Sequence, residues 1–121
     1  MPSEPSFATA VNCMDGRVQE PVSAFARKQF GVDYVDMVTE AGPVADINAS
    51  VLRDVSISVA AHRSCGIVVA AHADCAGNPV ANEAQQAQCL AAAKLLRKKY
   101  PQLEVVPVWV NAASKVVVIS E

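Results

Sequence analysis

The strongest constraint on how this chain folds is a run of five apolar residues, 67–71, that is followed at once by the polar segment HADC. A strand with apolar residues at every position must be buried on both faces, because successive side chains point to opposite sides of the sheet. Hydrophobic residues make up 52% of the chain and aromatic residues only 5%. Most of the apolar residues are Ala and Val, so these two residue types must build most of the core. Val favours buried strands, and Ala lets helices pack closely on a sheet. The sequence therefore predicts a central sheet covered by helices.

Segments with strand and helix patterns alternate along the chain. We expect an α/β fold with a mostly parallel sheet of four to five strands and helices on both faces, in one compact domain over residues 1–121. Glu20 and Pro21 are typical of a helix start, and Asp46 is a candidate cap for the second helix. The expected strands are 7–12, 32–39, 67–71, 104–111 and 116–120, and the expected helices run from about 20 to 30, 47 to 63 and 82 to 100.

The charge of the chain excludes several classes of partner. Ten basic and 12 acidic residues give a net charge of −2, and the isoelectric point is near 5.6. Nucleic acids and anionic membrane surfaces bind clustered Lys and Arg, so we expect neither partner. No apolar run approaches the ~18 residues that span a bilayer, and the first residues lack the pattern of a signal peptide. We therefore expect a cytoplasmic protein whose four cysteines are free thiols or metal ligands.

Three potential metal ligands follow two of the expected strands. Cys13 comes directly after the first strand, and His72 and Cys75 come just after the third. Ligands collect at the carboxyl ends of parallel strands, so these side chains converge if the two strands are neighbours. Two thiolates and one imidazole form a three-ligand zinc set with an open fourth position, as in catalytic sites. The alternative is that both cysteines are core residues and the histidine is an ordinary loop residue.

Asp15 and Arg17, two and four residues after Cys13, favour the metal interpretation. A lone carboxylate directly after an apolar strand is unfavourable, and an ion pair with Arg17 relieves that cost. Such a pair beside a metal can orient a bound water. The alternative is a plain structural ion pair at the start of a helix.

Five further residues have structural interpretations. We expect His62 to stabilise the carboxyl end of the second helix, Cys65 to be a small buried residue at a turn, and Cys89 to pack within a helix. We expect Asp74 to shape the loop between the two ligands. Trp109 is expected in the core or at an interface.

Cys13-Met14-Asp15-Gly16-Arg17 followed by His72-Ala73-Asp74-Cys75 resembles the paired C-x-D-x-R and H-x-x-C motifs of the β-class carbonic anhydrases. The similarity covers roughly residues 8–111 and includes the Glu40-Ala41-Gly42 turn, although a carboxylate stands there in place of the family's amide. The resemblance implies zinc held by Cys13, His72 and Cys75, and a catalytic Asp15–Arg17 dyad. It also implies the reversible hydration of carbon dioxide to bicarbonate by zinc-bound hydroxide.

Two other functions remain open. Relatives of this fold hydrolyse carbon disulfide or carbonyl sulfide, and a zinc-binding protein of the same fold without turnover is the other alternative. A thiol redox protein is disfavoured, because the sequence contains no C-x-x-C. Residues 116–119 form an apolar segment at the expected edge of the sheet, and such edges invite pairing. We therefore expect a homodimer or higher homo-oligomer, formed through this edge or through the long helices.

Overall fold

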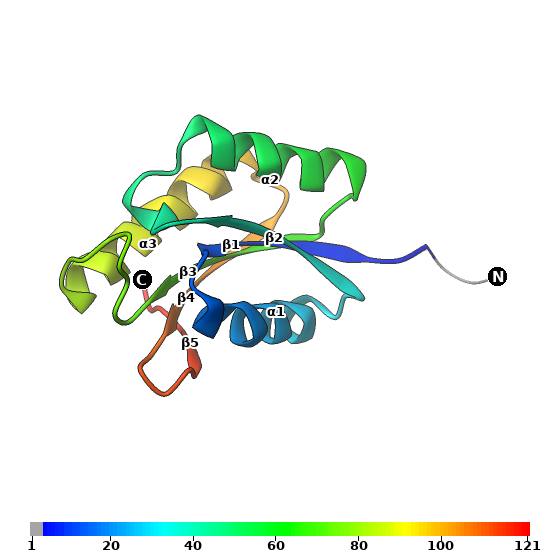
Figure 1. The fold of residues 1–121 in the computed structure, drawn as a ribbon. Coiled ribbons are helices and arrows are strands. Elements are labelled where there is room, and N and C mark those ends of the chain that lie inside the picture. Colours follow the sequence, from blue (N-terminus) through cyan, green and yellow to red (C-terminus); the bar gives the residue numbers. More distant parts are fainter. Residues whose placement is uncertain (1–3) are drawn as a thin grey trace.

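A computed structural model describes residues 4–121 and arranges them around one five-stranded sheet (Figure 1). The strand order is β2-β1-β3-β4-β5. Neighbours among β2, β1, β3 and β4 are parallel, and β5 is antiparallel to β4. The expected α/β class with a mostly parallel sheet is confirmed. The strands are β1 (Phe7–Cys13), β2 (Tyr34–Glu40), β3 (Gly66–His72), β4 (Glu104–Val110) and β5 (Val116–Val118).

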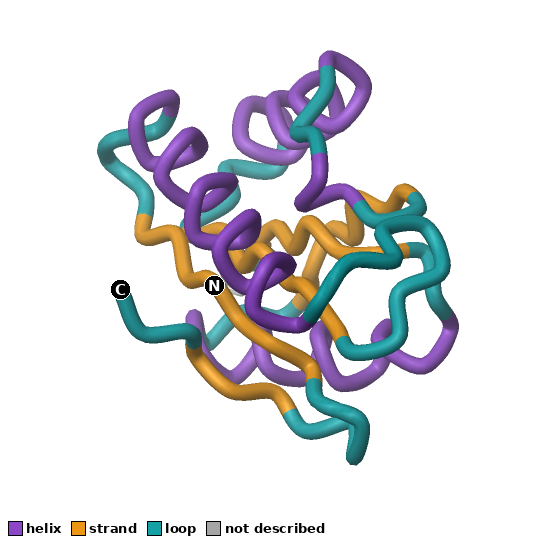
Figure 2. Tube along the Cα trace, turned by 90° about the vertical axis from the view of Figure 1, so that its left-hand side faces the viewer, coloured by secondary structure: helices purple, strands orange, loops and turns teal. Residues whose placement is uncertain are grey.

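Helices cover both faces of the sheet. They are α1 (Gly16–Phe30), α2 (Ala49–Ala61) and α3 (Asn82–Lys99), with a short 3-10 turn, η1 (Pro43–Ala45), before α2. Helix α1 lies on one face, and α2 and α3 lie side by side on the other (Figures 1 and 2). Each face has its own apolar core, because Val22 of α1 belongs to one buried cluster and Leu96 of α3 to the other. Among the described residues, none of the helices combines the length and hydropathy that a bilayer-spanning segment needs.

Strand β3 lies between β1 and β4, and all seven of its residues are buried. Its side chains alternate between the two cores: Ile67 and Val69 belong to the cluster with α2 and α3, and Val68 and Ala70 to the cluster with α1. This confirms the strand that the apolar run predicted. Glycine before the run makes room for Phe30, because a Cβ on Gly66 would lie 2.2 Å from the ring and would force that ring to move.

The first helix begins earlier than the sequence predicted, at Gly16 instead of Glu20. The reason is the cap: Oδ1 of Asp15 accepts a hydrogen bond of 2.9 Å from the backbone N–H of Arg17. A carboxylate in this position satisfies one of the free N–H groups of the first turn. Pro21 consequently lies inside the helix. The early start places Asp15 and Arg17 at the amino terminus of α1.

The second helix also begins at a different cap. Asn48, not Asp46, is the cap residue, and its Oδ1 accepts a hydrogen bond of 3.0 Å from the N–H of Val51. Asp46 instead ends the η1 turn in an extended conformation. The amide of Asn48 also donates to the Glu40 carboxylate at 2.8 Å, so the turn after β2 and the start of α2 are joined.

The turn before β3 corrects one prediction. Cys65 is exposed, and the buried side of the turn is occupied by Ser64, whose hydroxyl donates to the Gly66 carbonyl at 3.0 Å.

His62 lies at the carboxyl-terminal cap of α2, where its Nδ1 is 2.7 Å from an Asp36 carboxylate oxygen. Trp109 is half-buried against the core, as expected.

Cys89 is fully buried, as the sequence indicated, and burial raises the pKa of its thiol from 9.0 to about 12. Between these two pH values the unfolded chain ionises this thiol and the folded chain does not. The unfolded chain therefore binds fewer protons, and the stability of the fold falls as pH rises above 9, by about 1.4 kcal/mol per pH unit.

We predict that the Cys89→Ala variant lacks the loss of stability above pH 9 that ionisation of the Cys89 thiol causes in the parent. At neutral pH the variant is less stable than the parent, because it has lost buried contacts. Above pH 9 the difference in the free energy of unfolding narrows, since only the parent carries the titrating thiol. Urea denaturation of both proteins under reducing conditions, from pH 7 to 10.5, measures this difference in the free energy of unfolding. A difference that stays constant over this range would contradict the prediction.

Candidate metal centre

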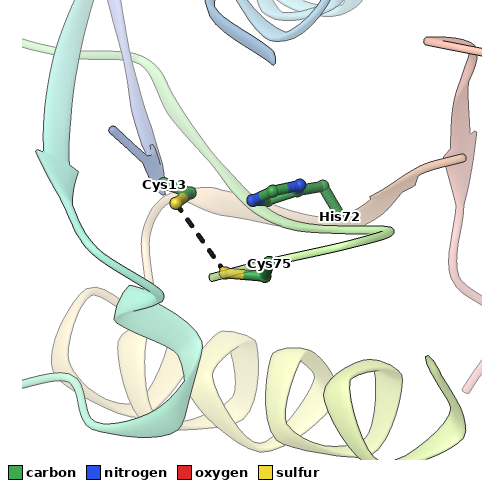
Figure 3. Close-up of side chains that lie close together, drawn as sticks. All are labelled: Cys13, His72 and Cys75. Carbon is green, nitrogen blue, oxygen red and sulfur yellow. Dashed lines mark hydrogen bonds between the residues drawn. The ribbon is translucent and has the colours of Figure 1, made fainter. Parts of the chain in front are cut away.

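Cys13, His72 and Cys75 come together at the carboxyl edge of the sheet (Figure 3). Cys13 is the last residue of β1, His72 is the last residue of β3, and Cys75 lies in the loop that follows. The parallel pairing of β1 with β3 brings these distant parts of the sequence to one place. The convergence expected from the sequence is therefore present.

The three side chains offer their ligand atoms at short range and away from solvent. The two sulfur atoms lie 3.8 Å apart, and all three ligand atoms lie within 4.8 Å of one another. Cys13, His72 and Cys75 are only 4%, 3% and 5% exposed. Burial first, and the neighbouring Cys13 thiol second, raise the pKa of the Cys75 thiol. A cation bound between the two sulfur atoms would counter both effects on the Cys75 thiol.

The imidazole of His72 is oriented with one nitrogen free. Its Nδ1 lies 2.8 Å from the backbone carbonyl oxygen of Ala73, and a carbonyl can only accept, so Nδ1 carries the hydrogen. In the neutral ring, Nε2 then holds a lone pair. Nε2 is buried and has no hydrogen-bond partner among residues 4–121. The ring points toward the two sulfur atoms (Figure 3).

This donor set fits a tetrahedral zinc ion. Two sulfur atoms that each lie about 2.3 Å from one tetrahedral zinc are about 3.8 Å apart, which is the separation observed here. A histidine that ligates zinc through one nitrogen commonly donates its other N–H to a backbone carbonyl, as His72 does. A buried, unpartnered nitrogen is unfavourable in a core, and a metal ion would satisfy it.

Two glycines let the loops of the site approach each other. Gly42, in the turn after β2, has a φ of +62°, and a Cβ there would lie 2.6 Å from the Cβ of Asn78. A Cβ on Gly77 would lie 2.7 Å from Ala41. Because the backbones touch, the N–H of Gly42 reaches Sγ of Cys13 at 3.5 Å.

Asp15 and Arg17 form a two-point ion pair beside the candidate metal centre. Nε of Arg17 donates to Oδ1 of Asp15 at 3.0 Å, and Nη2 donates to Oδ2 at 2.6 Å. These hydrogen bonds hold the pKa of the Asp15 carboxyl well below its usual range. Both carboxylate oxygens are therefore occupied by Arg17.

Arg17 also reaches the loop that carries Cys75. Its Nη2 lies 3.2 Å from the backbone oxygen of Asp74, and its Nη1 lies 3.4 Å from a carboxylate oxygen of the same residue. Asp74 has a φ of +59°, so it shapes the loop as expected and also contacts the guanidinium. A cavity of about 160 Å³ opens here, between Arg17, His72 and the turn that joins β4 to β5.

Sequence reasoning missed two amide side chains close to Cys13. Asn12 and Gln19 hydrogen-bond to the backbone around this cysteine, although neither is part of the metal-ligand set. One signal was present: an Asn at the end of a mostly apolar strand is costly when buried unless it has a specific partner. The position of Gln19 could not be predicted while the start of α1 was placed too late.

The chain was compared with known proteins. A family model described as "Putative carbonic anhydrase" matches residues 3–120. No curated protein matches the sequence. Among solved structures, a carbonic anhydrase from Streptococcus mutans is similar at 17% identity and a TM-score of 0.70, over 99% of this chain and 86% of that one.

Two other solved structures show the same likeness. Tetrameric β-carbonic anhydrases from Sordaria macrospora align at 16% identity and a TM-score of 0.66, over 97% of this chain and 81% of the other. A carbon disulfide hydrolase aligns at 13% identity and a TM-score of 0.67, over 97% and 80%. At these identities the structural likeness establishes the fold, whereas the family model covers nearly the whole sequence. The chain thus belongs to the carbonic anhydrase family that this model describes, and it has the β-carbonic anhydrase fold.

Proposed function

We propose that this protein is a zinc-dependent enzyme that catalyses the reversible hydration of carbon dioxide to bicarbonate. Cys13, His72 and Cys75 would hold the zinc ion. The observation that carries the proposal is Nε2 of His72, which is buried beside two thiols and has no partner among the described residues. When bound in such a site, zinc lowers the pKa of a water molecule to about 7 and thereby supplies hydroxide at neutral pH.

Asp15 and Arg17 prepare the site for the nucleophile. A hydroxide attacks carbon through a lone pair, so its hydrogen should point to an acceptor on the protein. Asp15 is the acceptor in this proposal, because its low pKa keeps the carboxylate ionised. A free carboxylate next to zinc would tend to bind the metal and close the fourth position. Arg17 prevents this by occupying both carboxylate oxygens.

The cavity beside His72 is the proposed binding place for carbon dioxide and bicarbonate. Arg17 lines it, and its side chain is 60% exposed. A guanidinium at the wall favours an anionic product over a neutral one. Val18 and Val110 supply apolar surface to the same cavity, which suits carbon dioxide.

A second candidate function is the hydrolysis of carbon disulfide or carbonyl sulfide. The observation in its favour is the likeness to a carbon disulfide hydrolase, at a TM-score close to that of the carbonic anhydrases. A third candidate is zinc binding without turnover. The same donor set serves all three, so activity assays on zinc-loaded protein are needed to distinguish them.

We also propose that two copies of the chain pair through β5. This strand has three residues and lies at the edge of the sheet, and Val117 and Val118 are each 51% exposed. An exposed apolar edge strand is a template for pairing with another chain. The tetrameric state of the Sordaria macrospora enzymes is consistent with assembly in this fold.

Replacing a zinc ligand should remove zinc and activity together. We predict about one zinc per chain in the parent, and a large loss of zinc in Cys75→Ser and His72→Ala. Hydration activity should fall at least 100-fold in both variants, because the metal supplies the nucleophile. Elemental analysis and a stopped-flow hydration assay measure these quantities. Cys65→Ser is the matched control, since Cys65 is exposed and outside the site.

The assay outcomes separate the candidate functions. A zinc-loaded parent that releases sulfide from carbon disulfide but does not hydrate carbon dioxide would support the second candidate. Zinc binding with neither activity would support the third. A parent that holds no transition metal after refolding with zinc would refute all three.

The proposed role of Arg17 predicts a pH-dependent loss of activity in Arg17→Ala. Zinc is retained, Asp15 moves onto the metal, and hydration falls steeply, most at low pH where hydroxide is scarce. Arg17→Lys should not restore activity, because an ammonium group cannot bind both carboxylate oxygens in a planar fork. Arg27→Ala, on the same helix and exposed, is the control. If the absorption spectrum of cobalt-substituted Arg17→Ala shows an unchanged, water-bearing site at every pH, the pair is only structural.

Pairing through β5 predicts a dimer or larger assembly that depends on this edge. We expect sedimentation equilibrium to give at least twice the chain mass at micromolar concentration. Val117→Lys should shift the protein toward the monomer, since edge charges oppose strand pairing. Ile57→Lys, at an exposed apolar residue on α2, is the control. A parent that sediments as a monomer at high concentration would contradict the proposal.

A further inference from the structure

Two amide side chains hold the backbone turn that leads from β1 into α1. Asn12 precedes Cys13 on β1 and is fully buried, and Gln19 lies in the second turn of α1 and is half-buried. They stand next to the candidate metal ligands without belonging to them. The turn between them carries both Cys13 and Asp15.

Both amides direct their N–H groups at carbonyls of this turn. Nε2 of Gln19 donates to the carbonyls of Cys13 and Asp15, each at 2.8 Å. Nδ2 of Asn12 donates to the Cys13 carbonyl at 3.1 Å and to Oε1 of Gln19 at 3.0 Å. The orientation of each amide is fixed, because every neighbour of the two nitrogens is an acceptor. All four amide hydrogens are therefore used in one connected network.

One atom of this network makes an unfavourable contribution to the stability of the fold. Oδ1 of Asn12 is buried and has no hydrogen-bond partner among residues 4–121. The preceding residues Ala10 and Val11 are apolar and fully buried, so an apolar side chain would suit this strand better. A buried polar group that conflicts with local packing is expected at functional sites.

The position of the network indicates what it does. A peptide whose carbonyl accepts two hydrogen bonds cannot rotate freely, so the direction of the following chain is fixed. The Cys13 carbonyl is held by both amides, and the Asp15 carbonyl is held by Gln19. These two residues carry the sulfur atom of the metal centre and the carboxylate that pairs with Arg17.

We propose that Asn12 and Gln19 are positioning residues that fix the turn from Cys13 to Asp15 for zinc binding. The amides hold Sγ of Cys13 toward Cys75 and His72, and they hold the Asp15 carboxylate at the amino terminus of α1. This role rests on the proposed zinc site and does not depend on which small molecule the enzyme converts. Groups that orient a metal ligand typically affect metal affinity by about 10- to 100-fold.

The first test replaces Gln19 by Met, which keeps the length of the side chain and removes its hydrogen bonds. We expect the zinc affinity of Gln19→Met to fall about tenfold or more, measured by competition with a chelator. Gln29→Met is the matched control: it makes the same change on the same helix at an exposed position. The control should bind zinc as tightly as the parent.

The second test separates positioning from a merely structural role. Asn12→Leu has a similar size and removes the unpartnered Oδ1 together with the donors. We expect the metal-free variant to melt at or above the temperature of the metal-free parent, while its zinc affinity falls about tenfold. A structural role would instead lower the melting temperature and leave the zinc affinity unchanged.

Parent-like zinc affinity in Gln19→Met would overturn the proposal, even if Asn12→Leu failed to fold. Failure of the proposed function is distinguishable. A parent that binds zinc without hydrating carbon dioxide refutes the reaction, and the affinity measurements still decide the role of the amides. A parent that binds no zinc overturns both.

Discussion

Strand β1 pairs in parallel with β3 through Thr9–Val11 and Ile67–Val69, and the candidate metal centre depends on this register. The pairing sets the ends of the two strands side by side, so Cys13 and His72 emerge at the same edge of the sheet. A shift of one residue would turn each side chain to the opposite face. It would also exchange the residues that fill the two cores. The same alternation that buries β3 on both faces therefore places the ligands.

Beyond the strands, backbone contact between loops completes the site. Gly42 and Gly77 come from the turns after β2 and β3, and no side chain fits between them. Their contact brings the N–H of Gly42 to the Cys13 sulfur and keeps Cys75 near it. The candidate ligands thus come from strand ends and loops, and α1 contributes Arg17 and Gln19 beside them. The end of β4 and the turn that follows it then close one side of the cavity beside His72.

The features predicted from the sequence were those that local patterns encode. The buried run at 67–71 and the two ligand motifs gave the sheet and the convergence of Cys13, His72 and Cys75, because both depend on strand ends. The start of α1 was misplaced, since Pro21 is a strong signal but the Asp15 cap lies earlier. Cys65 proved exposed because Ser64 takes the inward position, which no periodicity indicates. The network of Asn12 with Gln19 required the three-dimensional turn.

Arg17 connects the two segments that carry the candidate ligands. Its guanidinium binds the Asp15 carboxylate, two residues after Cys13, and the backbone oxygen of Asp74, directly before Cys75. The side chain is 60% exposed, and exposed ion pairs contribute little to folding. Arg17 thus joins the two segments of a buried site and adds little to the stability of the fold. Its presence is better explained by a role in positioning these segments. Asn12 supports the same conclusion. It lies next to Cys13 and has a buried oxygen without a hydrogen-bond partner among the described residues, which is unfavourable for folding. The polar residues around the candidate metal centre thus support the proposed positioning role, whereas the apolar cores hold the fold.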